Sequence, residues 1–138
     1  MRISKLSFCI VAMCCLSACR TTYMVSQNKV LVFGSGGGIT GMVTTYLLTA
    51  DGKLYTMATQ GTKTLLKEKI RAREVNELFE EAKQLKDPKM QCNRPGNMYY
   101  FLYIFNQDSN PDCMWGENGF TPSAEVLELY NELMELTI

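Results

Sequence analysis

The sequence predicts an α+β domain: an antiparallel sheet of about five to six strands with two helices packed on one face, in the order ββββ-α-ββ-α. Three observations lead to this class. Apolar and β-branched runs of strand length occupy much of residues 29–66 and 97–116. Residues 72–86 and a segment near the C-terminus instead repeat apolar side chains at helical spacing. Asp51-Gly52, between two apolar runs, is typical of a β-hairpin turn.

The first four strands are expected at residues 29–33, 39–48, 54–58 and 62–66. The glycine-rich residues 34–38 separate the first two and are interpreted as a glycine bulge or a flexible connection. Asp51 and Gly52 tolerate the positive φ angles of a type I′ turn, so they should join the second and third strands in a hairpin. Gln60-Gly61 forms the next turn.

Two helices follow from the apolar periodicity. The first is expected over residues 72–86 and ends at Asp87-Pro88, because the residue before proline avoids the α conformation. Its apolar stripe comprises Val75, Leu78, Phe79, Ala82 and Leu85. The second is expected to begin with Thr121 as N-cap and Pro122 as the first helical residue. Its apolar face comprises Val126, Leu127, Tyr130, Leu133 and Met134.

An aromatic hairpin is expected between the helices, with strands at residues 97–107 and 113–116 and a turn at residues 108–111. Alternation along the first strand predicts one buried set of side chains: Tyr100, Leu102 and Ile104. The exposed set would be Tyr99, Tyr103 and Phe105. Core packing accounts for most of these rings, and an exposed aromatic face would mark a site for a protein partner or a glycan.

The N-terminal residues are interpreted as a targeting segment rather than as part of the fold. A short basic start precedes the apolar residues 6–18, which are fewer than the roughly 20 that a membrane-spanning helix needs. The run ends in Leu16-Ser17-Ala18-Cys19, which resembles the lipobox of bacterial lipoprotein signal peptides. This resemblance implies cleavage before Cys19 and attachment of lipid to its thiol. The alternatives are an ordinary cleaved signal peptide and an uncleaved anchor.

The lipobox resemblance divides the chain into a signal peptide at residues 1–18, a tether at residues 19–27 and one domain at residues 28–138. It implies a bacterial cell-envelope protein held at a membrane by its N-terminal lipid. We expect the periplasmic side of the outer membrane, although the resemblance itself selects neither the membrane nor its face. The membrane is then one partner, and a protein of unknown identity is the other that we expect. The sequence as a whole also resembles small bacterial lipoproteins of unknown function.

Composition excludes several function classes. Without Arg2 and Lys5, 12 of the 14 basic side chains remain against 14 acidic ones, which argues against nucleic acid as a partner. Histidine is absent, so the chain has no Ser-His-Asp or Cys-His catalytic group and lacks the commonest zinc ligand. The glutamates of the predicted helices are interpreted as solvated surface. We therefore expect no enzyme, no catalytic residue, no metal and no cofactor.

Two cysteines, Cys92 and Cys113, lie in the predicted domain, because Cys9, Cys14 and Cys15 would leave with the signal peptide. In an oxidising compartment a pair of thiols is more often bridged than free. We therefore expect a disulfide between Cys92 and Cys113. The alternative is two buried or unpaired thiols.

The glycine-rich segment does not read as a phosphate loop, because it leads into a strand rather than a helix and no Gly-Lys-Ser/Thr follows it. Gly36, Gly37, Gly38 and Ile39 instead form a candidate partner-binding loop. Gly37-Gly38-Ile39-Thr40-Gly41 resembles the Gly-Gly-aromatic-x-Gly motif of emfourin-type inhibitors of thermolysin-like metalloproteases, with Ile39 in place of the aromatic residue. The resemblance implies, as an alternative function, inhibition of such a protease.

Overall fold

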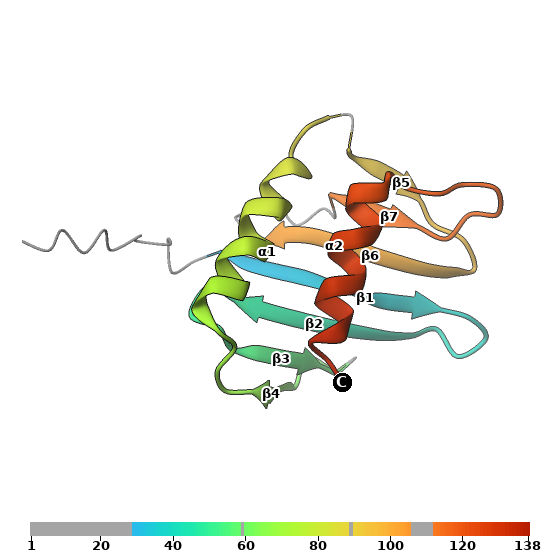
Figure 1. The fold of residues 1–138 in the computed structure, drawn as a ribbon. Coiled ribbons are helices and arrows are strands. Elements are labelled where there is room, and N and C mark those ends of the chain that lie inside the picture. The colour runs from blue at the N-terminus through green and yellow to red at the C-terminus, as the bar shows by residue number, and fades with distance from the viewer. Residues whose placement is uncertain (1–28, 59, 89, 106–111) are drawn as a thin grey trace, which may run out of the picture.

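The computed structural model describes residues 29–58, 60–88, 90–105 and 112–138, which form one sheet and two helices. The first part contains β1 (Val30–Gly37), β2 (Met42–Thr49), β3 (Leu54–Met57) and β4 (Lys63–Lys67). After α1 (Ala72–Gln84) come β5 (Cys92–Arg94), β6 (Met98–Phe105), β7 (Cys113–Trp115) and α2 (Ala124–Glu135). The predicted α+β class is confirmed (Figure 1).

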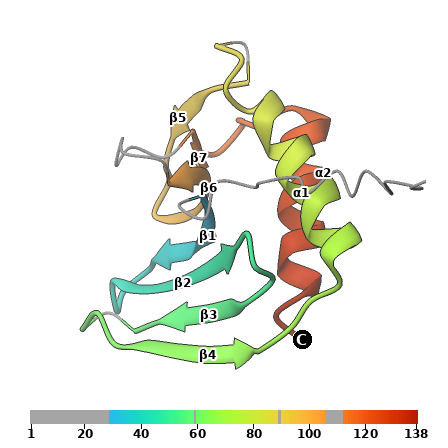
Figure 2. The same ribbon diagram turned by 90° about the vertical axis from the view of Figure 1, so that its left-hand side faces the viewer.

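The described strands form one seven-stranded sheet in the order β4-β3-β2-β1-β6-β7-β5, which can be followed in Figure 2. Two features correct the expectation of an antiparallel sheet of five to six strands. β5 is an additional strand, and it pairs parallel to β7, so the sheet is mixed. Cys92-Asn93-Arg94 has no β-branched residue, and its strand conformation depends on pairing with β7 rather than on local propensity.

The glycine-rich segment continues β1 instead of interrupting it, contrary to the predicted strand end at residue 33. Gly34 and Gly36 pair with Thr45 and Val43 on β2, and with Phe101 and Tyr99 on β6. A Cβ atom on Gly34 would lie 2.0 Å from the Thr44 carbonyl oxygen and 2.9 Å from Cζ of Phe101, and one on Gly36 would lie 2.6 Å from the Tyr99 hydroxyl oxygen. The glycines are therefore strand residues that leave room for the backbone of β2 and for aromatic rings of β6.

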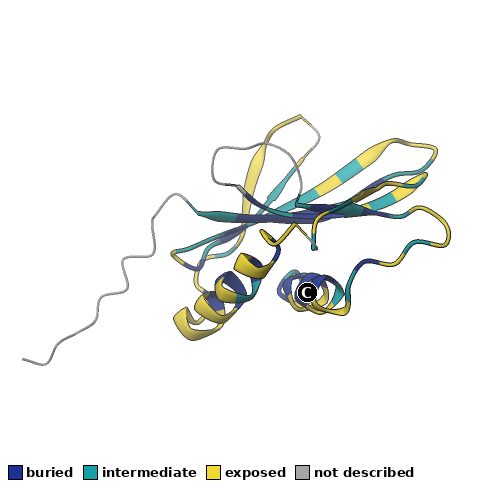
Figure 3. Ribbon diagram, turned by 90° about the horizontal axis from the view of Figure 1, so that it is seen from above, coloured by how far each residue is buried: buried dark blue, intermediate teal, exposed yellow. Residues whose placement is uncertain are grey.

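Both helices lie on the same face of the sheet, and the core lies between these two layers (Figure 3). The sheet contributes fully buried apolar side chains from its central strands: Leu31, Phe33, Leu48, Leu54 and Leu102. The helices contribute Val75, Leu78, Phe79, Ala82, Val126, Leu129 and Leu133. All but Leu129 belong to the predicted apolar faces, and Leu127 and Met134, which were also predicted, are only half-buried. Removing this apolar surface from water is the main driving force for the two-layer arrangement.

The second helix begins two residues later than predicted. Ser123, not Thr121, is the N-cap, and its Oγ accepts a hydrogen bond from the backbone N–H of Val126 at 3.4 Å. Pro122 is buried and precedes the helix. Both Thr121 and Ser123 are good capping residues, so only the packing of the connection from β7 decides between them.

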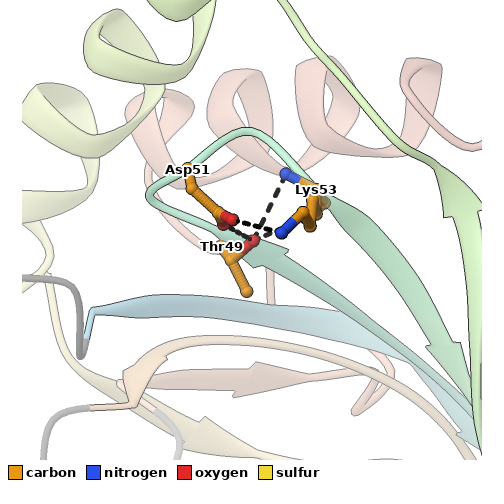
Figure 4. Close-up of polar contacts among 3 residues, drawn as sticks. All are labelled: Thr49, Asp51 and Lys53. Atoms are coloured by element: carbon orange, nitrogen blue, oxygen red, sulfur yellow. Dashed lines mark hydrogen bonds and ion pairs between the residues drawn. The ribbon is translucent and has the colours of Figure 1, made fainter.

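The hairpin expected at Asp51-Gly52 joins β2 and β3, but its loop has three residues rather than the two of a type I′ turn. The backbone N–H of Thr49 donates to the Lys53 carbonyl at 2.9 Å, and Gly52 has the positive φ of 85°. Figure 4 shows Asp51 between two partners: the Thr49 hydroxyl donates to it at 2.5 Å and the Lys53 ammonium lies 2.8 Å away. These contacts lower the pKa of Asp51.

Candidate functional site

The two ends of β1 define two ends of the sheet. Val30 pairs with Thr49, the last residue of β2, so it marks the end at which the chain enters the domain. Gly37 pairs with Met42 on β2 and with Met98 on β6, at the other end. The turn between β1 and β2 projects from this second end, away from the entry point, as Figure 1 shows.

The turn that follows β1 owes its shape to glycine. Gly37, Gly38 and Gly41 have φ angles of 98°, 75° and 59°, a region that other residues rarely adopt. The N–H of Gly38 donates to the carbonyl of Asn97 at 2.8 Å, which attaches the turn to the start of β6. A Cβ atom on Gly37 would lie 2.0 Å from that same carbonyl oxygen. The backbone therefore holds Ile39 at the tip of the hairpin.

Four large apolar or aromatic side chains at this end are exposed: Ile39, Met42, Met98 and Tyr100, which we call the distal patch. Ile39 is fully exposed, and Met42 and Met98 are 65% and 50% exposed. Residues directly opposite in a ladder share a face, so Met42 and Met98 flank Gly37 on one face, and alternation places Tyr100 there too. No charged residue occurs at positions 30–50 or 95–105.

An aromatic cluster supports the distal patch from the helix side. The ring of Tyr100 lies 5.8 Å from that of Trp115 and 5.9 Å from that of Tyr130, which packs edge-on against Trp115 at 5.0 Å. The Tyr130 hydroxyl donates to the carbonyl of Gly34 at 3.1 Å. Burial, followed by the electrostatic effects of Tyr100 and Tyr46, raises the pKa of Tyr130 to about 12, so this donor stays protonated at physiological pH.

The alternation predicted for β6 needs correction at Tyr100. Leu102 and Ile104 are buried as expected, but Tyr100 is 39% exposed. Tyr100 lies on the expected face of the sheet, but near the end of the sheet marked by Gly37. There one side of its ring packs on Trp115 and Tyr130, and the rest is exposed to solvent. Tyr99 and Tyr103 are half-buried rather than exposed, and the side chain of Phe105 and residues 108–111 lie outside the described part.

The residues predicted for the partner-binding loop are adjacent in the structure, but they belong to two different elements. Gly36 and Gly37 belong to β1, whereas Gly38 and Ile39 lie in the turn. Sequence reasoning missed Met42 and Met98, although Met42 follows the turn directly and Met98 opens the aromatic strand. The missing signal is the strand register, which brings both methionines opposite Gly37.

Cys92 and Cys113 are joined by a disulfide in the structure, at the sheet edge formed by β5 and β7. They are directly paired residues with Cα atoms 4.4 Å apart. Cys113 is fully buried and Cys92 is half-buried. Cys19, the predicted lipidation site, lies outside the described residues.

A second surface feature, the interhelical groove, lies between α1 and α2. It is lined by Lys67, Glu74, Glu77, Leu78, Glu81, Glu132, Glu135 and Leu136. Partial burial, and then repulsion from Glu81 and the other nearby carboxylates, raises the pKa of Glu132. Among the described residues, no three His, Cys, Asp or Glu side chains are grouped so that they could hold a metal ion.

No described helix is long and apolar enough to cross a membrane. Comparison with models of known protein families and with curated protein sequences found no match to this chain.

Proposed function

We propose that this chain is a lipid-anchored protein of the bacterial cell envelope with a non-catalytic binding role. The proposed address rests on the lipobox-like residues 16–19, with Cys19 as the acylated N-terminus of the mature protein. Mass spectrometry of the native protein tests it. The expected mass is that of residues 19–138 with two or three acyl chains, and a mass that begins with unmodified Met1 would contradict it.

The observation that supports a binding role is the distal patch. Burying apolar surface is favourable by about 25 cal/mol for each Å² removed from water. A group of exposed apolar side chains therefore favours contact with another molecule. Ile39 contributes nothing to the core, because it is fully exposed. The patch also lies at the end of the sheet away from Val30, where the tether enters, so a membrane-held domain would present it outward.

Cross-linking in envelope preparations can test this role with the variant Ile39→Ser. The matched control is Leu65→Ser, because Leu65 on edge strand β4 is also exposed, at 46%, but lies outside the distal patch. We expect Ile39→Ser to remove a cross-linked product that the wild type and Leu65→Ser both give. Identical products from all three proteins would contradict binding through the distal patch.

An alternative function, inhibition of a thermolysin-like metalloprotease, is favoured by one observation. The five residues that resemble the emfourin motif comprise the last residue of β1 and the turn after it, and this turn is held to Asn97 and presents Ile39 to solvent. A rigid, exposed turn suits insertion into a protease cleft. In an inhibition assay, wild type and Leu65→Ser should slow the protease at micromolar concentration and Ile39→Ser should not. No slowing by the wild type would exclude this alternative.

A further inference from the structure

The methionines of the domain differ sharply in exposure. The structure describes six of them, and four are half-buried: Met57, Met90, Met114 and Met134. The two that are exposed, Met42 and Met98, are both in the distal patch. Reagents in solution therefore reach the thioethers of the patch more easily than the others.

Gly37 and Gly38 increase this accessibility. Gly37 lies between Met42 and Met98 in the ladder and has no side chain to cover either of them. A Cβ atom on Gly38 would lie 3.0 Å from Sδ of Met98, so that sulfur rests against bare glycine backbone. The Met98 thioether thus rests against main chain, and the side chains of both Met42 and Met98 are open to solvent.

We propose that Met42 and Met98 form an oxidation site, at which peroxide converts the thioethers to sulfoxides and so switches the distal patch from apolar to polar. In each step the sulfur lone pair attacks one oxygen of hydrogen peroxide, the O–O bond breaks, the S–O bond forms and water leaves. Sulfur loses two electrons and peroxide gains them. A dithiol reductant reverses the step by supplying two electrons and two protons, and the sulfoxide oxygen departs as water.

The consequence of this oxidation rests on the proposed binding role. A sulfoxide is a strong hydrogen-bond acceptor, and burying it against an apolar partner without a donor costs free energy. Ile39 and Tyr100 are the only other members of the patch, so oxidation of Met42 and Met98 changes half of it. The core contains neither methionine, so the fold should persist while binding is lost.

Peptide mapping of the detergent-solubilised full chain after limited hydrogen peroxide treatment tests the site itself. Met42 and Met98 should be oxidised about tenfold faster than Met57, Met90, Met114 and Met134. The emission of Trp115, the only tryptophan, reports on integrity of the adjacent core, and it should keep its wavelength. Oxidation of all these methionines at equal rates in the folded protein would overturn the proposal.

A second experiment separates this proposal from the proposed function. Cross-linking of peroxide-treated wild type should lose the Ile39-dependent product, and treated Met42→Leu/Met98→Leu should keep it, because leucine is apolar and resists oxidation. Loss from both proteins would overturn the switch. If untreated wild type gives no Ile39-dependent product, the proposed binding role fails, whereas selective oxidation in the mapping experiment still establishes the modification site.

Discussion

The distal patch and the interhelical groove lie on the same domain but have opposite chemistry. The patch consists of uncharged side chains held around a glycine turn. The groove carries five carboxylates and one lysine, Lys67, whose ammonium donates to the carbonyl of Ile138 at 3.1 Å. The difference follows from the sequence, in which residues 30–50 contain no charge and the helices hold most of the glutamates.

This contrast indicates which surface is suited to a partner. Carboxylates at a solvated groove are stable in water and need no contact. Covering exposed Ile, Met and Tyr side chains with a partner lowers the free energy of the system, because apolar surface leaves water. The two regions also differ in how they are built, because the patch depends on backbone geometry that only glycine allows, whereas the groove depends on side chains of two helices.

Gly37→Ala should give the largest effect and tests whether backbone geometry builds the patch. The new Cβ would lie 2.0 Å from the Asn97 carbonyl oxygen at a φ of 98°, so we expect a loss of about 3 kcal/mol in the free energy of unfolding. Gly41→Ala is the control, because nothing lies within 4 Å of its Cβ. It should cost only about 1 kcal/mol of backbone strain. Equal losses in urea denaturation would contradict this account.

Tyr130→Phe should have an intermediate effect and tests the connection between the helix layer and the strand that leads to the patch. The Gly34 carbonyl would lose its hydroxyl donor, at a cost of about 1 kcal/mol. Because burial raises the pKa of Tyr130 to about 12, the wild-type contribution is complete below pH 10 and is lost as the pH rises towards 12. The stability of the variant should therefore fall less than that of the wild type as the pH rises from 10 towards 12. Parallel stability–pH curves would contradict the prediction.

Glu132→Gln should have the smallest effect, with the opposite sign. The raised pKa of Glu132 means that its charged form is disfavoured in the folded protein, so the wild type gains stability as the pH falls through that pKa. At neutral pH the variant should therefore be slightly more stable, by a few tenths of a kcal/mol because the side chain is exposed and screened. The advantage should disappear in acid and in high salt, and a persistent advantage would show another cause.

Prediction from sequence succeeded where local patterns are strong. Helical spacing located α1 and the buried Val126, Tyr130 and Leu133 of α2, and the Asp51-Gly52 hairpin joins β2 and β3. It was wrong where partners matter more than local preference. The end of β1 was placed before the glycines, although pairing with β2 and β6 carries the strand to Gly37. β5 was missed because β7 and its parallel pairing create it.

The candidate site shows the same division. Gly36, Gly37, Gly38 and Ile39 were selected from sequence, because a glycine run between two strands indicates an exposed connection that a partner could bind. Met42 and Met98 were not, since residues far apart in sequence meet only through strand register. The exposure of Tyr100 was also unpredictable, because alternation gives a side chain's face and not how far the helices extend over that face.

The sequence by itself determined the α+β class, most of the buried face of each helix, a glycine-rich connection between the first two strands and the uncharged character of its surroundings. Each of these depends on residue type and spacing within one segment. Only the tertiary structure decided that two methionines flank Gly37, that β5 runs parallel to β7 and that five carboxylates line one groove. Those features arise from contacts between distant segments, and such contacts are chosen by burial of the whole core.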